Sequence, residues 1–144
     1  MIGRFLLLSL LAVFTLTARA DLDPVEQNYV DLMLSGDLRD LKRAAKLMHD
    51  AREDNREVLD VAAEVLLTLY PGAPDRQIDT LSWLSRAIGI SGDGRYHDAL
   101  SEVVEQGPHR KLRRHAKKAL RQLGAADSGQ YVRGTTTIKT SNYQ

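Results

Sequence analysis

The chain has 144 residues, a formal net charge of +1 and no cysteine, which excludes disulfide bonds and cysteine-based zinc or redox sites. The charge is unevenly distributed. Residues 21–106 carry 9 basic and 18 acidic side chains, whereas residues 107–144 carry 9 basic and 1 acidic side chain. Such a division can steer charged partners, or it can stabilise one end of the fold against the other.

The first 20 residues predict a secretory signal peptide. A basic start at residues 1–4 is followed by an apolar run at residues 5–14, and Ala18 and Ala20 supply the small residues of a cleavage site before Asp21. A membrane anchor is the alternative, but the run is much shorter than the roughly 20 apolar residues that span a bilayer. We therefore expect an exported protein, cleaved after Ala20 and without a transmembrane segment after processing. The absence of cysteines and of N-x-Ser/Thr glycosylation sequons favours the bacterial periplasm over a eukaryotic secretory route.

The rest of the chain carries regular helix punctuation. Asp23, Pro24 and Glu26 form a capping signature for a first helix that ends at Gly36, and Asp37 caps a second. Spacings of three and four between apolar residues predict further helices at about 56–70, 78–90, 96–104 and 109–123. No convincing period-two alternation occurs before Gly124. We expect an all-α domain of about six short antiparallel helices over residues 21–124, followed by a polar tail at residues 125–144.

The chain also repeats itself. The tripeptide Ser-Gly-Asp at residues 35–37 recurs at residues 91–93, and residues 58–66 align with residues 112–120. Repeated helix pairs that cannot bury their apolar faces alone stack into a solenoid. These repeats therefore favour a stack of helix pairs.

Residues 86–95 (RAIGISGDGR) and 112–120 (LRRHAKKAL) resemble HEAT-like repeats. That family repeats an A-L-G-x-x-G-D-x-R turn, an apolar helix and a V-R-R-x-A-x-x-A-L helix. The resemblance covers residues 86–124 and is looser over residues 38–69, and Ile88 and Ile90 replace the usual leucine and small residue. It implies a short α-solenoid whose usual role is protein binding, and it brings no active site with it.

The predicted sixth helix is strongly basic, because residues 107–124 contain no acidic residue. Arg110, Arg114, Lys117 and Arg121 share one flank of that helix and are candidate contacts for an anionic partner. Acidic protein, lipid headgroups or polyphosphate would fit this chemistry, and the export signal argues against nucleic acid. The alternative is a solvated helix whose cations favour its own C-terminal dipole or pair with the acidic part of the chain.

No catalytic, cofactor-binding or metal site is predicted. The four histidines fall in different elements, and the six-residue separation of His109 and His115 is wrong for one helical face. The chain has no G-x-S-x-G turn and no glycine-rich phosphate loop. We therefore expect a protein that is not an enzyme.

Two further features leave alternatives open. Trp83 fits either packing in the core or between repeats, or an aromatic anchor on a binding face. The tail is β-prone and polar, so we expect it to be disordered or to add a strand to a partner's sheet.

The sequence favours a non-enzymatic interaction module or adaptor of the periplasm, with another envelope protein as its partner. The alternative is an anion-binding envelope protein that uses residues 109–123.

Overall fold

The computed structural model describes residues 22–138 and Tyr143, so the predicted signal peptide lies outside the described residues. The fold is all-α as predicted, and no strand occurs in the described part of the chain. The described residues form six α-helices, with short 3-10 helices at Tyr70–Gly72 and Gly94–Tyr96. The α-helices are α1 (Pro24–Leu34), α2 (Leu38–Ala51), α3 (Arg56–Leu69), α4 (Asp75–Ile90), α5 (His97–Gln106) and α6 (Arg110–Gln122).

Short polar caps fix the beginnings of the first helices. The Asp23 carboxylate accepts hydrogen bonds from the backbone N–H groups of Val25 and Glu26, and the Glu26 side chain closes a capping box. The Asp37 carboxylate accepts hydrogen bonds from the backbone N–H groups of Arg39 and Asp40 at the start of α2, and the Asn55 side chain accepts one from the N–H of Glu57 at the start of α3. The first three helices therefore begin where the sequence predicts, because these side chains accept hydrogen bonds from backbone N–H groups in the first turn of each helix.

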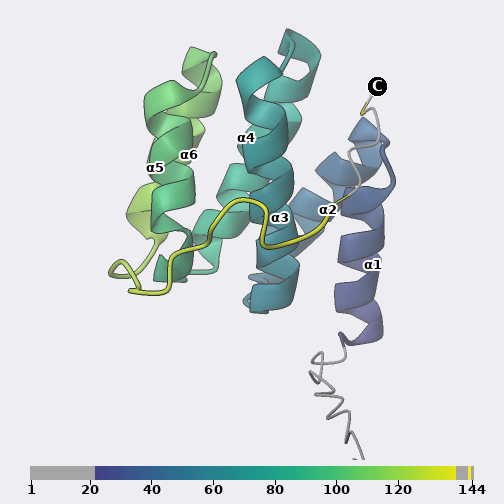
Figure 1. Cartoon of the computed structure of the whole chain (residues 1–144). Helices are drawn as coiled ribbons and strands as arrows, with labels where there is room; N and C mark the ends of the chain where they lie inside the picture. Colours follow the sequence, from purple (N-terminus) through teal and green to yellow (C-terminus); the bar gives the residue numbers. More distant parts are fainter. Residues whose placement is uncertain (1–21, 139–142, 144) are drawn as a thin grey trace, which may run out of the picture.

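The helices pack in two layers (Figure 1). Helices α1, α3 and α5 form one layer, and α2, α4 and α6 form the other; each helix contacts the next within its layer, and α1–α2, α3–α4 and α5–α6 contact each other between layers. The central helices α3 and α4 supply more of the core than any other two helices, including fully buried Leu59, Leu66, Leu81 and Leu84. This arrangement is a short stack of antiparallel helix pairs.

Helices α4 and α6 approach each other closely because a glycine lies at their contact. A Cβ atom on Gly89 would lie 2.6 Å from both Cα and Cβ of Ala119. These two small residues thus allow the backbones of α4 and α6 to approach closely. The close approach also sets the distance between the solvent-facing side chains of the two helices.

The sequence repeat does not correspond to a repeated helix pair. The Ser-Gly-Asp turns are alike in detail, since Gly36 has φ 82° and Gly92 has φ 71°, and Asp37 and Asp93 each cap the next helical segment along the chain. However, the matching segments 58–66 and 112–120 belong to α3 and α6, which lie in different layers. The recurrence therefore records similar local turns and similar apolar spacing.

The described part of the tail, residues 125–138, crosses the layer of α1, α3 and α5 (Figure 1). The Tyr131 N–H donates to the carbonyl of Arg95 at 2.9 Å, and the buried Tyr131 hydroxyl donates to the carboxylate of Glu64. The N–H of Gly134 donates to the same carboxylate at 3.0 Å. The expectation of disorder is therefore corrected for these residues: they form no strand in this chain, but they are held in place because the buried Tyr131 hydroxyl and the buried Glu64 carboxylate hydrogen-bond to each other. Addition of a strand to a partner's sheet stays a prediction.

The end of the tail reaches the first helix pair. The Tyr143 hydroxyl donates to the carbonyl of Met33, and the Gln77 side chain donates to the carbonyl of Tyr143 at 3.1 Å. The tail thus links the α6 end of the stack to the α1 end. None of the described helices combines the length and the apolar character needed to cross a bilayer.

Candidate functional site

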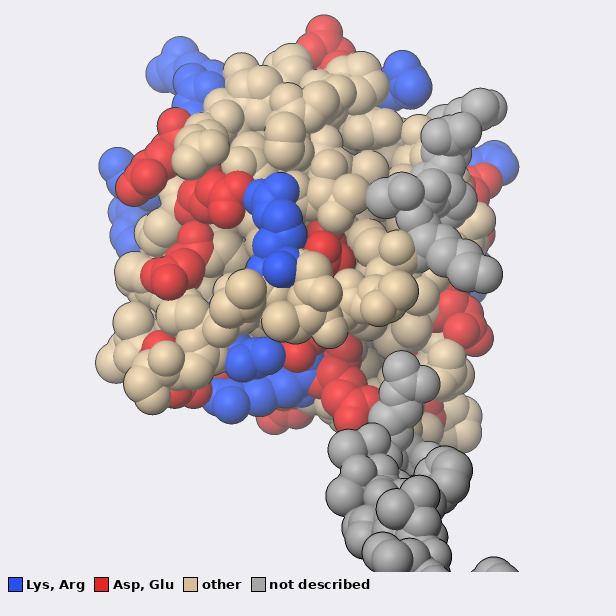
Figure 2. All heavy atoms as spheres, in the orientation of Figure 1, with Lys and Arg blue, Asp and Glu red and all other residues tan. Residues whose placement is uncertain are grey.

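The two helix layers carry opposite charge. In the layer of α2, α4 and α6, α2 holds four basic and two acidic residues, and α4 holds two of each. Helix α6 holds seven basic residues and no acidic one. In the other layer, α1, α3 and α5 hold two, three and three acidic residues, and only α3 holds a basic one. Figure 2 views the side of α1, α3 and α5 and shows acidic side chains gathered over α5. We call the outward surface of α2, α4 and α6 the basic face.

The four predicted contacts form the outermost row of the basic face. Arg110, Arg114, Lys117 and Arg121 are all exposed on α6. Within the described residues none of the four lies within 4.0 Å of a carboxylate oxygen as an ion pair. The suggested pairing with the acidic part of the chain is thus not seen for this row, and its charge faces solvent.

A second row on α6, formed by Lys111, His115 and Lys118, faces α4. The Asp79 carboxylate of α4 forms ion pairs with Lys111 of this row and with Lys42 of α2. Asp79 of α4 lies 2.8 Å from the Lys111 Nζ of α6 and 2.6 Å from the Lys42 Nζ of α2. These ammonium groups, Lys111 first, lower the pKa of Asp79 to about 2, so the carboxylate is ionised at neutral pH. One anion thus bridges three helices across the basic face.

Trp83 lies on the basic face, half-buried between cations. The guanidinium carbon of Arg86 lies 3.9 Å from the ring centroid, the Lys46 Nζ lies 5.0 Å from it, and the His49 ring meets it edge-on at 5.6 Å. Because cations already cover the ring, Trp83 does not present a bare aromatic face. The ring also packs against the hydrophobic core, as one of the two sequence interpretations expected, and it holds Arg86 and Lys46 in place, a role that neither interpretation included.

His115 marks the point where the positive charges of α4 and α6 converge. Partial burial and the nearby cations Arg114, Arg86, Lys111 and Lys118 lower the pKa of His115 below its ordinary value. Three of these cations are on α6, and Arg86 comes from α4. At the seam between the two helices, cations of both helices therefore oppose the protonation of His115.

Several basic residues elsewhere have structural partners. Arg56 lies 2.7 Å from Asp93 and 2.9 Å from Asp127, and Arg95 lies 3.0 Å from Asp60. Toward the α5 side of α6, Arg113 donates to the carbonyl of Gly107 at 2.7 Å. These cations hold loops and the tail, which distinguishes them from the solvent-facing outer row of the basic face.

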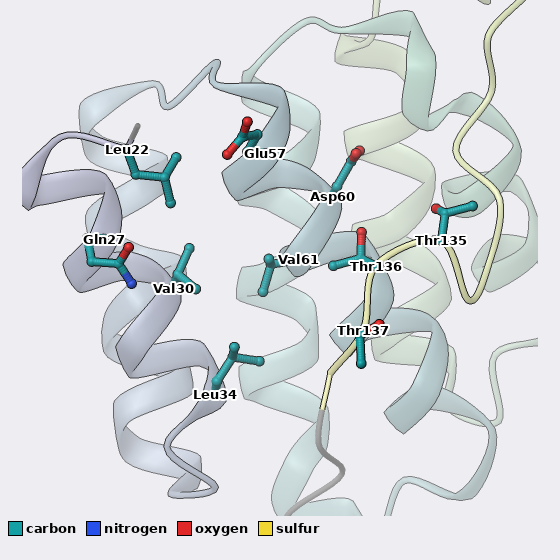
Figure 3. A pocket seen from close by; sticks show the side chains of 10 residues that line it. All are labelled: Leu22, Gln27, Val30, Leu34, Glu57, Asp60, Val61, Thr135, Thr136 and Thr137. Atoms are coloured by element: carbon teal, nitrogen blue, oxygen red, sulfur yellow. The ribbon is translucent and has the colours of Figure 1, made fainter. Parts of the chain in front are cut away.

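The acidic layer contains a hollow of about 500 Å³ between α1, α3 and the tail. Figure 3 shows side chains of α1 on one side and three tail threonines on the other, with those of α3 between them. Asp60 at its rim is engaged, because its oxygens accept hydrogen bonds from Arg95 and from the Tyr96 hydroxyl. The remaining lining residues are Leu22, Gln27, Val30, Leu34, Glu57, Val61, Thr135, Thr136 and Thr137.

Potential catalytic or metal-binding groups are dispersed. Within residues 22–138, together with Tyr143, no three histidine, aspartate or glutamate side chains are grouped so that they could hold a metal ion. His49 lies on α2, His97 and His115 lie on α5 and α6, and His109 precedes α6 near Asp75.

The chain matches no known family model, and comparisons with curated proteins and with solved structures give no significant match.

Sequence reasoning located the α6 row but missed the contributions of α2 and α4. Lys42, Lys46 and His49 recur at helical spacing, as do Asp79, Trp83 and Arg86, so each row was visible in its own helix. What the sequence did not reveal was that α2, α4 and α6 share one layer.

Proposed function

We propose that the protein is a non-enzymatic binding module of the bacterial periplasm that engages an acidic partner protein through its basic face. The observation that carries the proposal is the division of charge between the two layers, with thirteen basic and four acidic residues on the helices of one layer. Uncompensated positive charge over a surface attracts partners of opposite charge and raises their association rate.

An acidic protein fits this face better than a lipid surface does. Helices that bind at a membrane interface bury Trp, Phe or Leu side chains among the acyl chains. Of the large apolar side chains that are exposed among the described residues, only Leu47 belongs to α2, α4 or α6. Trp83 is covered by Arg86 and flanked by Lys46. The face offers discrete, positioned cations, which suit carboxylates on a folded or extended protein partner.

Poly-L-aspartate serves as a probe of acidic polypeptide binding. We expect the wild-type chain to bind it with an affinity that falls steeply as salt rises, because screening shortens the Debye length to about 8 Å at physiological ionic strength. The quadruple variant Arg110→Gln, Arg114→Gln, Lys117→Gln and Arg121→Gln should bind at least about tenfold more weakly at low salt, since every tenfold change requires only about 1.4 kcal/mol.

A matched control separates a local effect from one of net charge. The double variant Asp31→Asn with Glu105→Gln raises the net charge on the opposite layer, where both residues are exposed, and should change poly-L-aspartate affinity little. Equal affinity of the wild type and the quadruple variant would overturn the proposal. Binding to vesicles that contain phosphatidylglycerol, without binding to poly-L-aspartate, would also overturn it and assign the face to lipid.

A further inference from the structure

The seam between α4 and α6 brings basic side chains from both helices together. Lys111, His115 and Lys118 recur along the side of α6 that faces α4, and the Lys111 ammonium group contacts Asp79 of α4. From α4, Arg86 lies against the Trp83 ring at 3.9 Å, so that its guanidinium group is held in place. Exposed Arg114 borders the same row.

We propose that a carboxylate or another oxyanion of the partner binds at this seam beside His115 and that binding there takes up a proton on His115. This inference rests on the proposed function of the basic face and deepens it, because it names one subsite and makes binding dependent on pH. Histidine is suited to this role because its ordinary pKa lies close to physiological pH.

The coupling follows from the charges that face His115. In the free protein, Lys111, Arg114 and Lys118 on α6 and Arg86 on α4 oppose its protonation. The acidic group of α4 nearest this row, Asp79, is already shared between Lys42 and Lys111. An oxyanion placed among these cations offsets their repulsion, so the pKa of His115 rises in the complex.

Binding should consequently tighten as the pH falls. For each unit by which the bound anion raises the pKa of His115, the affinity for the anion at low pH exceeds the affinity at high pH by up to a further factor of ten. His49, across Trp83 from this seam, is the nearby titratable group whose contribution must be separated.

Two measurements on the full chain test the inference. The first follows the imidazole NMR signals of His115, assigned by their loss in His115→Asn, during pH titrations with and without poly-L-aspartate. We expect the pKa of His115 to lie below its ordinary value in the free protein and to rise when the polymer is present. The second compares poly-L-aspartate affinities at pH 5.5 and 7.5. The gain at pH 5.5 should be several-fold larger for the wild type and for His49→Asn than for His115→Asn.

Arg86→Gln provides a readout that needs no ligand, because removing this cation should raise the pKa of His115 in the free protein. Binding of poly-L-aspartate that leaves the His115 titration unchanged would overturn this inference while the basic face remains the binding surface. Absence of poly-L-aspartate binding by the wild-type chain would overturn both this inference and the proposed function.

Discussion

Replacing Asp79 by asparagine should weaken the fold while strengthening anion binding. The carboxylate bridges Lys42 of α2 and Lys111 of α6, and its loss leaves these two ammonium groups without the anion between them. The same change adds one unit of positive charge to the basic face. We therefore expect opposite signs for stability and for poly-L-aspartate affinity, a combination that general damage to the fold would not produce.

The magnitude follows from the pKa of Asp79, which falls from 3.8 to about 2. At 1.36 kcal/mol for each pKa unit, the shift sets an upper bound of about 2.5 kcal/mol on the stabilisation by the ionised carboxylate. The Asp79 side chain is 45% exposed, so solvent screening reduces this contribution, and we expect a loss of about 1 kcal/mol at pH 7. Because the folded-state pKa is lowered, the contribution is present above pH 4 and is lost as the pH falls toward 2.

Urea unfolding of the wild type and Asp79→Asn at pH 7, 4 and 2 measures this difference directly. Asp50→Asn is the matched control, since Asp50 is an exposed carboxylate on α2 that contacts no lysine or arginine among the described residues. Equal stability of Asp79→Asn and the wild type at pH 7, or the same difference in stability at pH 2 as at pH 7, would show that the ionised Asp79 carboxylate does not stabilise the fold.

Three other substitutions test the packing. Gly89→Ala should lower the free energy of unfolding by about 2 kcal/mol in urea titrations, because its Cβ would overlap Ala119; unchanged stability would show that α6 moves freely. Arg52→Gly should raise the melting temperature, with a gain of about 1 kcal/mol, because Arg52 ends α2 in the left-handed region at φ 53°; a lower melting temperature would contradict this. Tyr131→Phe should cost about 2 kcal/mol, because Glu64 loses a buried donor, and hydrogen exchange should speed up at the N–H of Gly134, whereas unaltered exchange would count against the tail contact.

The helices were predictable because their signals are local. A capping aspartate such as Asp23 and a stop such as Gly36 act within a few residues, so the sequence alone places the turn between the first two helices and the residues at which they begin. The α6 row was predictable for the same reason, since helical periodicity alone puts Arg110, Arg114, Lys117 and Arg121 on one flank.

The remainder of the candidate site depends on contacts between distant segments. Trp83 receives Lys46 and His49 from α2 and Arg86 from its own helix, and this set exists only once α2 packs beside α4. The tail was misjudged for a similar reason: its polar composition showed no period, whereas a single ring, Tyr131, found a buried partner in Glu64. Local composition does not reveal such pairings.

The path of the tail changes how this small stack should unfold. In a row of helix pairs that touch only their neighbours, the outer pairs can separate one at a time while the rest stays folded. Here a strap fastened at Arg95 and Glu64 also reaches Met33 in the first pair. Unfolding of the first or the last helix pair therefore also disturbs the contacts of the tail with the other pairs. We expect the stack to unfold in one cooperative transition, without separate loss of the outer pairs.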